Sequence, residues 1–204
     1  MTDMIDHIVF DIGRVLIHYD PEIPFRRLIP DEAERTRFLS DICTPEWNLE
    51  QDRGRRWSEA EDALIADHPG HAENIRAFHR HWHEMTPYAY DESVDVFRGL
   101  IAGGRDVTLL TNFSTETYRL ARRLYPFLDE ARGVTVSGEI GLIKPDRAIY
   151  DRHVRSFGLD PAKTLFFDDS ARNVEGARAA GWQAELVAEP ADLLRGLARH
   201  GIAA

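Results

Sequence analysis

Cysteine is almost missing from this sequence of 204 residues, since Cys43 stands alone. One thiol cannot close an internal disulfide, so a disulfide framework is excluded and a reducing, cytoplasmic location is expected. Long hydrophobic runs are missing too, because no stretch approaches the roughly 20 apolar residues of a membrane span. The chain also has no internal repeat and no low-complexity tract, so we predict a globular protein with no membrane partner.

Positive charge is in short supply, with 25 Lys and Arg against 35 Asp and Glu, a formal net charge of −10. The average field of such a chain repels the phosphates of nucleic acids and acidic lipid head groups. We therefore expect neither nucleic acid nor a membrane surface as a partner, and a small molecule as the ligand. The sequence does not fix the oligomeric state and leaves a homodimer open.

Short apolar runs rich in β-branched and aromatic residues alternate with amphipathic stretches over most of the chain. The runs expected to form strands are residues 7–10, 107–110, 134–136, 164–167 and 184–187. The stretches between the later runs have helical periodicity and end near glycine or proline. Strands and helices that alternate in this way predict an α/β fold, a doubly wound parallel sheet of the Rossmann-like kind.

Residues 18–90 interrupt this alternation with helical patterns only. Within them, Ser58 followed by Glu61 forms a capping box, which predicts a helix beginning after Ser58. Connections in such folds normally take about two to six residues, and an insertion this long usually serves binding. We therefore expect an α/β core domain of residues 1–17 and 91–204, with residues 18–90 as a helical cap domain above the strand ends.

Polar side chains follow three of the predicted strands, at the edge where open parallel sheets bind ligands. Together with a lysine on a nearby loop, these side chains are Asp11, Thr111, Asn112, Lys144, Asp168 and Asp169. Three carboxylates facing one ammonium leave an excess of about two negative charges, which a divalent cation cancels. Oxygen ligands with open positions for water or substrate suit Mg²⁺ best. The set outlines a phosphoryl-transfer site, in which Asp11 can form an aspartyl-phosphate.

Four segments resemble, in order and spacing, the four motifs of the haloacid dehalogenase-like (HAD) hydrolase superfamily. They are residues 10–16 (FDIGRVL), 109–112 (LLTN), 144–145 (KP) and 166–173 (FFDDSARN). The helical insertion after the first motif is similar to the branch of alpha-D-glucose-1-phosphate phosphatase and the phosphatase domain of soluble epoxide hydrolase. The double aspartate, Asp168 and Asp169, followed by Asn173 is also similar to that branch. The resemblance implies a HAD-like core and a hydrolase of phosphoric monoesters.

The resemblance also implies which residues hold the metal. Asp11 would be both the nucleophile and a ligand of Mg²⁺. The backbone carbonyl of Gly13 and the carboxylate of Asp169 would complete the protein ligation, and Asn173 would brace the metal ligand.

The remaining matches imply contacts to the phosphate. Thr111 and the N–H of Asn112 would bind it, and Lys144 would neutralise it and orient the nucleophile. Asp168 would be a supporting acid, hydrogen-bonded to Lys144 or to a metal-bound water. Arg14 stands where the superfamily normally has glycine or asparagine, so its backbone is either ordinary or strained for function. Its side chain would either lie beside the phosphate or contact the cap, or be an exposed charge.

Gly13 is the main departure from the superfamily, because most of its phosphatases carry an aspartate there that protonates the leaving group. General acid help is worth a factor of roughly 10² to 10⁴, so its loss favours an anomeric sugar oxygen or a halide as the leaving group. His18, Tyr19 and Asp20 follow the turn and are candidate substitutes, against the alternative that they form a solvated linker.

Three groups of side chains in the insertion have two interpretations each. A histidine pair four residues apart shares a helix face, but zinc needs a third donor, so a solvated face is favoured. Tryptophans that could line a pocket are expected to fill the core of the insertion, and an arginine cluster is expected to be a surface charge run. The groups are His79 and His83; Trp47, Trp57 and Trp82; and Arg53, Arg55 and Arg56.

The sequence therefore predicts a Mg²⁺-dependent phosphatase of a small phosphorylated metabolite, such as a sugar phosphate. The first alternative is a hydrolytic 2-haloacid dehalogenase, in which Asp11 attacks carbon. Gly13 fits that reaction, but the paired Asp168 and Asp169 repel a carboxylate substrate unless a cation is present. The second alternative is a catalytically silent protein that binds a phosphate ligand, and the intact nucleophile and lysine speak against it.

Overall fold

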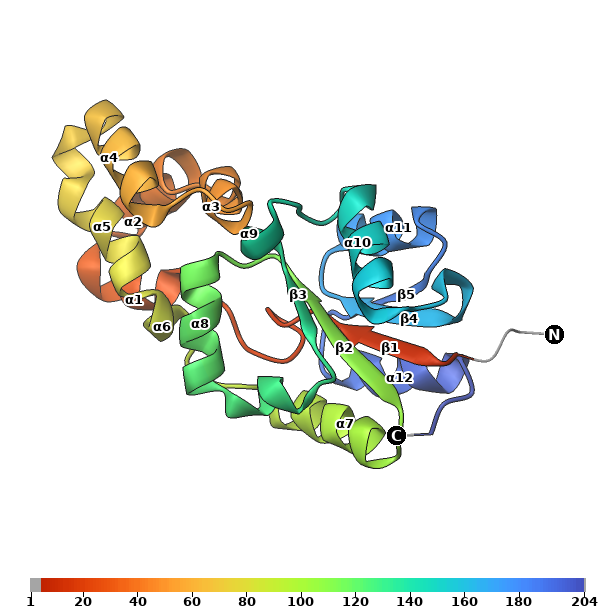
Figure 1. Ribbon diagram of the computed structural model, residues 1–204. Coiled ribbons are helices and arrows are strands. Elements are labelled where there is room, and N and C mark those ends of the chain that lie inside the picture. Colours follow the sequence, from red (N-terminus) through yellow and green to blue (C-terminus); the bar gives the residue numbers. More distant parts are fainter. Residues whose placement is uncertain (1–4, 204) are drawn as a thin grey trace.

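The computed structural model describes residues 5–203, and its centre is a parallel sheet in the order β3-β2-β1-β4-β5 (Figure 1). The strands are β1 (His7–Phe10), β2 (Asp106–Thr111), β3 (Val134–Val136), β4 (Thr164–Asp168) and β5 (Gln183–Leu186). β1 lies in the middle, with Phe10 opposite Leu109 of β2 and Phe167 of β4. The carboxyl ends of the three central strands therefore meet at one edge. The predicted α/β sheet is confirmed.

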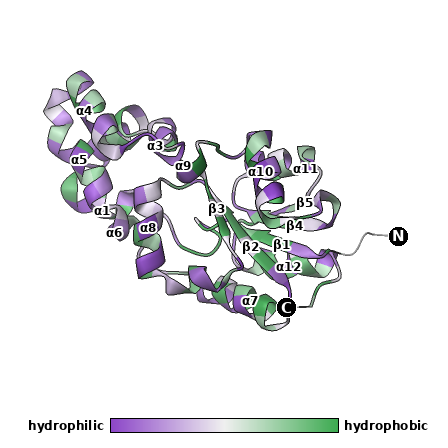
Figure 2. Ribbon diagram, viewed as in Figure 1, coloured by the Kyte–Doolittle hydropathy of each residue, from purple (hydrophilic) through white to green (hydrophobic). Residues whose placement is uncertain are grey.

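Helices cover both faces of this sheet, and alternate residues of each strand point to opposite faces. Val9 and Phe166 pack under α10 and α11, whereas Phe10 and Phe167 pack toward α7 and α12. Figure 2 shows the central strands as the hydrophobic part of the fold, with polar residues on the outer sides of the helices. The elements of this region are α7 (Asp91–Ala102), α8 (Thr115–Leu124), η3 (Pro126–Glu130), α9 (Ser137–Ile140), α10 (Arg147–Phe157), η4 (Pro161–Lys163), α11 (Ala171–Ala179) and α12 (Ala191–Arg199).

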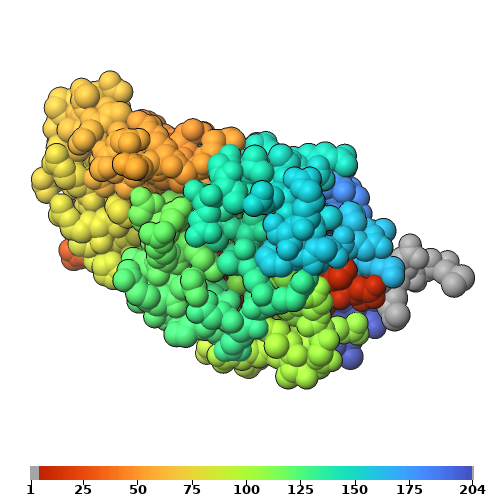
Figure 3. Space-filling model, viewed as in Figure 1, coloured from red at the N-terminus to blue at the C-terminus, as the bar shows by residue number. Residues whose placement is uncertain are grey.

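The chain between β1 and α7 forms the expected helical insertion, which is a lobe at one end of the molecule in Figure 3. Aromatic rings fill its centre: Phe78 lies 5.9 Å from Phe25 and 5.6 Å from Trp47, between ring centroids. Trp47 and Trp57 thus belong to the core of the insertion, as predicted. Its elements are α1 (Glu22–Leu28), α2 (Glu32–Arg37), η1 (Phe38–Ile42), α3 (Pro45–Asp52), α4 (Trp57–Asp67), η2 (Pro69–His71), α5 (Ala72–Arg80) and α6 (Trp82–Met85).

The start of α4 corrects one prediction. The helix begins at Trp57, with Arg56 in the N-cap position, so the capping box of Ser58 and Glu61 is wrong. Trp57 is 2% exposed and its Nε1 donates to Ser114 Oγ at 2.9 Å. This tertiary contact fixes where the helix begins and outweighs the local capping signal.

Two further predictions concern the whole chain. Within the described residues, no helix is long and apolar enough to cross a membrane. The division into a core domain and a cap domain stays a prediction, and residues 1–4 and 204 of the predicted core lie outside the described residues.

Candidate active site

Asp11 directly follows β1, at the carboxyl edge of the sheet. Its backbone N–H donates to the Phe167 carbonyl at 2.9 Å, and its Oδ1 accepts from the Ile12 N–H at 2.7 Å. The same oxygen lies 2.9 Å from Lys144 Nζ. Burial raises the pKa of Asp11 to about 7, and the charges of Asp168 and Asp169 add to this rise while Lys144 opposes it. The carboxyl group is thus held rigidly in a site with excess negative charge.

Lys144 is the cation at the centre of the site, with only 2% of its surface exposed. Besides its contact with Asp11, its ammonium donates to Asp168 Oδ2 at 2.6 Å and to the Leu110 carbonyl at 3.1 Å. Burial alone would lower the pKa of Lys144, but the two carboxylates outweigh it and the net shift is upward. The lysine therefore stays charged and bridges the ends of β1, β2 and β4.

The adjacent residues Asp168 and Asp169 lie in two different environments. Asp168 is fully buried, and its carboxylate accepts from Lys144, from the Ser170 N–H at 2.8 Å and from Asn173 Nδ2 at 3.0 Å. Asp169 is more open, and burial together with the charge of Asp168 raises its pKa. The predicted contact between Asp168 and Lys144 is confirmed. The predicted bracing by Asn173 is corrected, since it holds Asp168 and not the expected metal ligand Asp169.

Thr111 ends β2 beside these carboxylates, and Asn112 follows it. Thr111 is buried, and its hydroxyl has no hydrogen-bond partner among residues 5–203. Such a group is costly unless a ligand or water satisfies it. The Asn112 side chain accepts from the Lys144 N–H at 2.9 Å and donates to the Lys144 carbonyl at 3.1 Å. The Asn112 side chain therefore holds the backbone of the loop that carries Lys144, a role that the sequence did not suggest.

The loop after Asp11 carries both departures from the superfamily pattern. Arg14 has φ +57°, a left-handed backbone, so of the two alternatives for this position the strained one is observed. Its Nε donates to the Tyr19 carbonyl at 3.2 Å, and its guanidinium lies 3.8 Å from Asp169. The Arg14 side chain is therefore a half-exposed cation at the rim of the site. At Gly13, an added Cβ would meet nothing within 4 Å among the described atoms.

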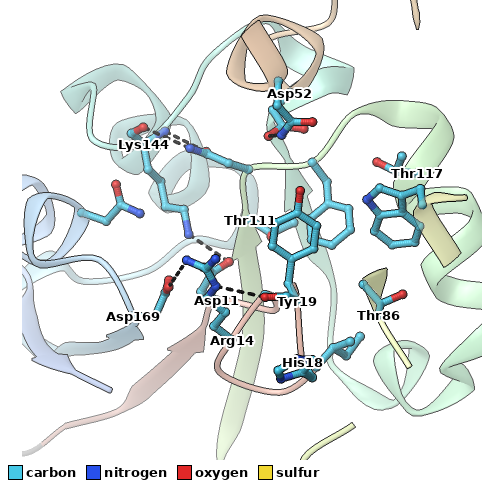
Figure 4. A pocket seen from close by; sticks show the side chains of 17 residues that line it. Asp11, Arg14, His18, Tyr19, Asp52, Thr86, Thr111, Thr117, Lys144 and Asp169 are labelled. Atoms are coloured by element: carbon cyan, nitrogen blue, oxygen red, sulfur yellow. Dashed lines mark hydrogen bonds and ion pairs between the residues drawn. The ribbon is translucent and has the colours of Figure 1, made fainter. Parts of the chain in front are cut away.

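A cavity of about 200 Å³ lies over these groups, between the sheet edge and the insertion (Figure 4). Of the candidate proton donors, His18 and Tyr19 line it, whereas Asp20 lies outside its lining and accepts from the Glu22 N–H at 2.8 Å. Trp82 also reaches the cavity, with its ring 5.6 Å from Phe113. The lining residues are Asp11, Gly13, Arg14, Ile17, His18, Tyr19, Asn48, Asp52, Trp82, Thr86, Thr111, Asn112, Phe113, Thr117, Lys144, Asp169 and Asn173.

Asp52 is the titratable lining residue that sequence reasoning missed. It is the last residue of α3, and nothing in the sequence separates it from the other acidic residues of the insertion. Burial raises its pKa to about 8, with a further rise from Asp11 and opposing effects from the Ser114 N–H and Lys144. A neutral carboxyl group at neutral pH therefore faces Asp11 across the cavity (Figure 4).

The other groups singled out in the insertion lie outside this cavity. His79 lies in α5 and His83 in α6, so the pair does not share one helix face, and the predicted solvated face is corrected because the half-buried ring of His79 stacks on Trp57 at 4.6 Å. Arg53, Arg55 and Arg56 are exposed, and Arg53 lies 3.4 Å from Asp146. These arginines form the expected surface charge run.

The residues at the sheet edge fit a divalent cation. Among the described residues, only Asp11, Asp168 and Asp169 bring three potential metal-binding side chains together, with one oxygen of each within 4.8 Å of the others. Asp168 is already saturated by donors, so Asp11 and Asp169 are the carboxylates with capacity for a metal. Burial, and to a lesser extent the neighbouring carboxylates, raises the pKa of both groups, and a bound cation would oppose that rise. Carboxylate oxygens are the ligands that Mg²⁺ prefers.

Comparison with known proteins gives the following matches. A family model described as haloacid dehalogenase-like hydrolase matches residues 5–181. The chain is 29% identical over 178 residues to the sesquiterpene phosphatase astK of Aspergillus oryzae, which covers 85% of each protein. A HAD-family enzyme of Bacteroides thetaiotaomicron, in complex with magnesium and inorganic phosphate, superimposes with a TM-score of 0.69 at 23% identity, over 89% of this chain and 93% of that one. An L-2-haloacid dehalogenase of Xanthobacter autotrophicus superimposes with a TM-score of 0.65 at 19% identity, over 98% of this chain and 85% of that one.

Proposed function

This chain belongs to the haloacid dehalogenase-like hydrolases, and from that membership we propose that it is a Mg²⁺-dependent phosphatase of a small phosphorylated metabolite, such as a sugar phosphate. The observation that carries this proposal is the pairing of two features in one cavity. Three carboxylates lie together with too few cations to balance their charge. Beside them, the buried Thr111 hydroxyl has no hydrogen-bond partner among the described residues. A cation with a phosphate supplies what both features need.

In the proposed site, Asp11, the Gly13 carbonyl and Asp169 hold Mg²⁺, which neutralises the phosphate and the nucleophile when bound. Thr111 and the Asn112 N–H bind phosphate oxygens, and Arg14 adds a positive charge at the rim. These assignments rest on the motif resemblance and on the positions of the side chains around one cavity.

The proposed reaction has two steps. An oxygen of Asp11 forms a bond to phosphorus as the bond between phosphorus and the leaving oxygen breaks, which gives an aspartyl-phosphate. Water then attacks phosphorus, the bond to Asp11 breaks, and inorganic phosphate leaves. Lys144 holds Asp11 in place throughout, and Asp168 holds Lys144. This arrangement supplies positioning and charge neutralisation, the two things that phosphoryl transfer requires.

The cavity size and the position of the insertion support a small substrate. A cavity of about 200 Å³ is below the roughly 300 to 1,000 Å³ of drug-sized ligand sites. A larger hollow of about 450 Å³ adjoins it along α3 and shares Asp52 and Lys144 with it. We propose that residues 18–90 act as a cap domain that selects the leaving group. The glucose-1-phosphate phosphatase branch is our proposal for the chain's place in the superfamily.

Hydrolysis of a panel of phosphate esters tests the proposal. We expect turnover in Mg²⁺, loss of turnover in EDTA, and an inactive Asp11→Asn variant. Activity that survives chelation would reject the mechanism. Chloride release from a 2-haloacid without metal would instead favour the dehalogenase. An absence of turnover together with no binding of fluoride-based phosphate mimics would favour the silent binding protein.

A further inference from the structure

The proposed reaction lacks one component, a proton donor for the leaving oxygen. The superfamily's usual donor position is Gly13, which has no side chain, and the space that a Cβ would take is open. An alkoxide leaves slowly without a proton, because general acid help is worth a factor of roughly 10² to 10⁴. A donor must therefore come from another side chain that lines the cavity.

Apart from Asp11, Arg14, Lys144 and Asp169, which have other proposed roles, three titratable side chains line the cavity, and two of them are poorly suited as the donor. His18 is held away by its own contacts, since Nδ1 lies 3.0 Å from the Tyr90 hydroxyl and its ring stacks on Tyr88 at 4.7 Å. Burial raises the pKa of the Tyr19 phenol well above its ordinary value, and the charge of Asp52 adds to the rise. A phenol this weakly acidic gives up its proton slowly. The third group is the Asp52 carboxyl.

Asp52 is fixed over the cavity by contacts between α3 and the core. Its backbone carbonyl accepts from Ser137 Oγ at 2.5 Å, and its Oδ2 accepts from Asn48 Nδ2 at 3.1 Å. Two residues later the chain turns at Gly54, with φ +108°, where a Cβ would lie 3.0 Å from the Gly138 carbonyl oxygen. Only glycine allows α3 to approach α9 this closely. The position of Asp52 is therefore built into the interface between the insertion and the core.

Burial is the main reason why Asp52 keeps its proton. It faces the carboxyl group of Asp11 and the cationic Lys144 across the cavity, with Tyr19 and the Ser114 N–H close by. Its pKa of about 8, which burial raises, means that the carboxyl carries a proton at neutral pH. A group that is acidic enough to give up a proton and still protonated near neutral pH is what general acid catalysis requires.

We propose that Asp52 is the proton donor to the leaving oxygen in the phosphatase reaction proposed above, in place of the side chain that Gly13 lacks. As the bond from phosphorus to the leaving oxygen breaks, that oxygen takes the proton of the Asp52 carboxyl, and the alcohol departs. The Asp52 carboxylate then takes a proton from the water that attacks phosphorus. The bond to Asp11 breaks, and Asp52 is again protonated for the next turnover. The inference rests on the proposed function.

Two esters that differ in their need for a proton test this proposal. p-Nitrophenolate leaves without protonation, whereas an alkoxide needs a proton. We expect Asp52→Asn to lower kcat for an alkyl phosphate by about 10²-fold or more, and for p-nitrophenyl phosphate by less than about tenfold. Glu50→Gln is the matched control, because Glu50 is an exposed acid of the same helix outside the cavity. It should leave both rates unchanged.

The pH profile of the unmodified protein gives a second measurement that does not depend on the variant folding. We expect kcat for the alkyl ester to fall above about pH 8 while kcat for the p-nitrophenyl ester stays level. If the unmodified protein hydrolyses both esters but Asp52→Asn slows them equally, or the two profiles coincide, the role of Asp52 is overturned and the phosphatase stands. If the unmodified protein hydrolyses neither ester, the proposed function itself fails.

Discussion

Replacement of Lys144 by methionine should destabilise the protein strongly and in a pH-dependent way. Methionine keeps the length of the side chain but removes the ammonium that contacts Asp11 at 2.9 Å and Asp168 at 2.6 Å. Loss of one partner from a buried ion pair costs about 3 to 5 kcal/mol, because the remaining charge has no compensation. At about 2 to 4 °C per kcal/mol for a chain of this size, the Tm should fall by roughly 6 to 20 °C at pH 8.

The loss in free energy of unfolding caused by Lys144→Met should become smaller as the pH falls. Even with the ammonium present, burial raises the pKa of Asp11 from 3.8 to about 7. Without Lys144 that pKa rises further. A carboxyl group whose pKa is higher in the folded than in the unfolded state contributes stability at low pH and loses it as the pH rises through the folded value. Between about pH 8 and pH 5.5 the folded variant therefore takes up protons that the unfolded chain does not.

Urea unfolding in EDTA at both pH values measures this effect. Lys163→Met is the matched control, since the only other lysine of the chain lies in an exposed ion pair with Asp6. Such a pair is worth about 1 kcal/mol or less. A Lys144→Met variant with the same free energy of unfolding as this control, or with a deficit that does not change with pH, would refute the picture of a buried lysine balancing two carboxylates.

Four further predictions test single residues of the site. Mg²⁺ at about 100 times its Kd should stabilise the unmodified protein by about 2.7 kcal/mol in a thermal-shift assay, and Asp169→Asn should lose most of that gain; an equal gain in the variant would exclude Asp169 as a ligand. Thr111→Val should leave the free energy of unfolding nearly unchanged but raise the Ki of inorganic phosphate about tenfold or more, since it removes a hydrogen bond to an anion; an unchanged Ki would contradict the phosphate role. Arg14→Gly should raise the free energy of unfolding, measured by urea denaturation, by about 1 kcal/mol, because glycine relieves the strain of the left-handed backbone. A decrease would mean that the contacts of the Arg14 side chain stabilise the protein by more than this strain costs. Gly13→Asp, added to Asp52→Asn, should restore hydrolysis of an alkyl phosphate at least about tenfold, and no recovery would mean that a carboxyl at this position is not aimed at the leaving oxygen.

The sequence predicted the sheet and its reactive edge because both follow from local patterns. The strand runs are short, apolar and separated by clear helix signals, and Asp11, Thr111 and Asp169 lie at or directly after the carboxyl ends of their strands. Parallel pairing then brings these residues together whatever the details of packing. The positions of Lys144 and Asp168 followed from the same topology, and the structure adds the contact between them.

The insertion was less predictable because its features depend on tertiary contacts. The start of α4 is set by the bond from Trp57 to Ser114, and these two residues are far apart in the sequence. Asp52 gains its significance from burial against the core, whereas the sequence shows only one acidic residue among many. Asn173 was assigned to the wrong aspartate because Asp168 and Asp169 are adjacent, and only side-chain direction distinguishes them.

A proton donor on the insertion changes what the interface with the core must do. In the usual arrangement of the superfamily, the nucleophile and the donor lie two residues apart on one loop, so their distance does not depend on the cap. Here Asp11 belongs to the sheet edge and Asp52 to α3, and the Ser137 hydroxyl is one link between the two parts. Its Oγ donates to the Asp52 carbonyl and accepts from the Phe113 N–H at 2.9 Å, which joins the insertion to the end of β2. A substrate that shifts α3 would therefore change the distance between nucleophile and acid. Because distance decides proton transfer, the insertion can select a substrate at the chemical step as well as in binding.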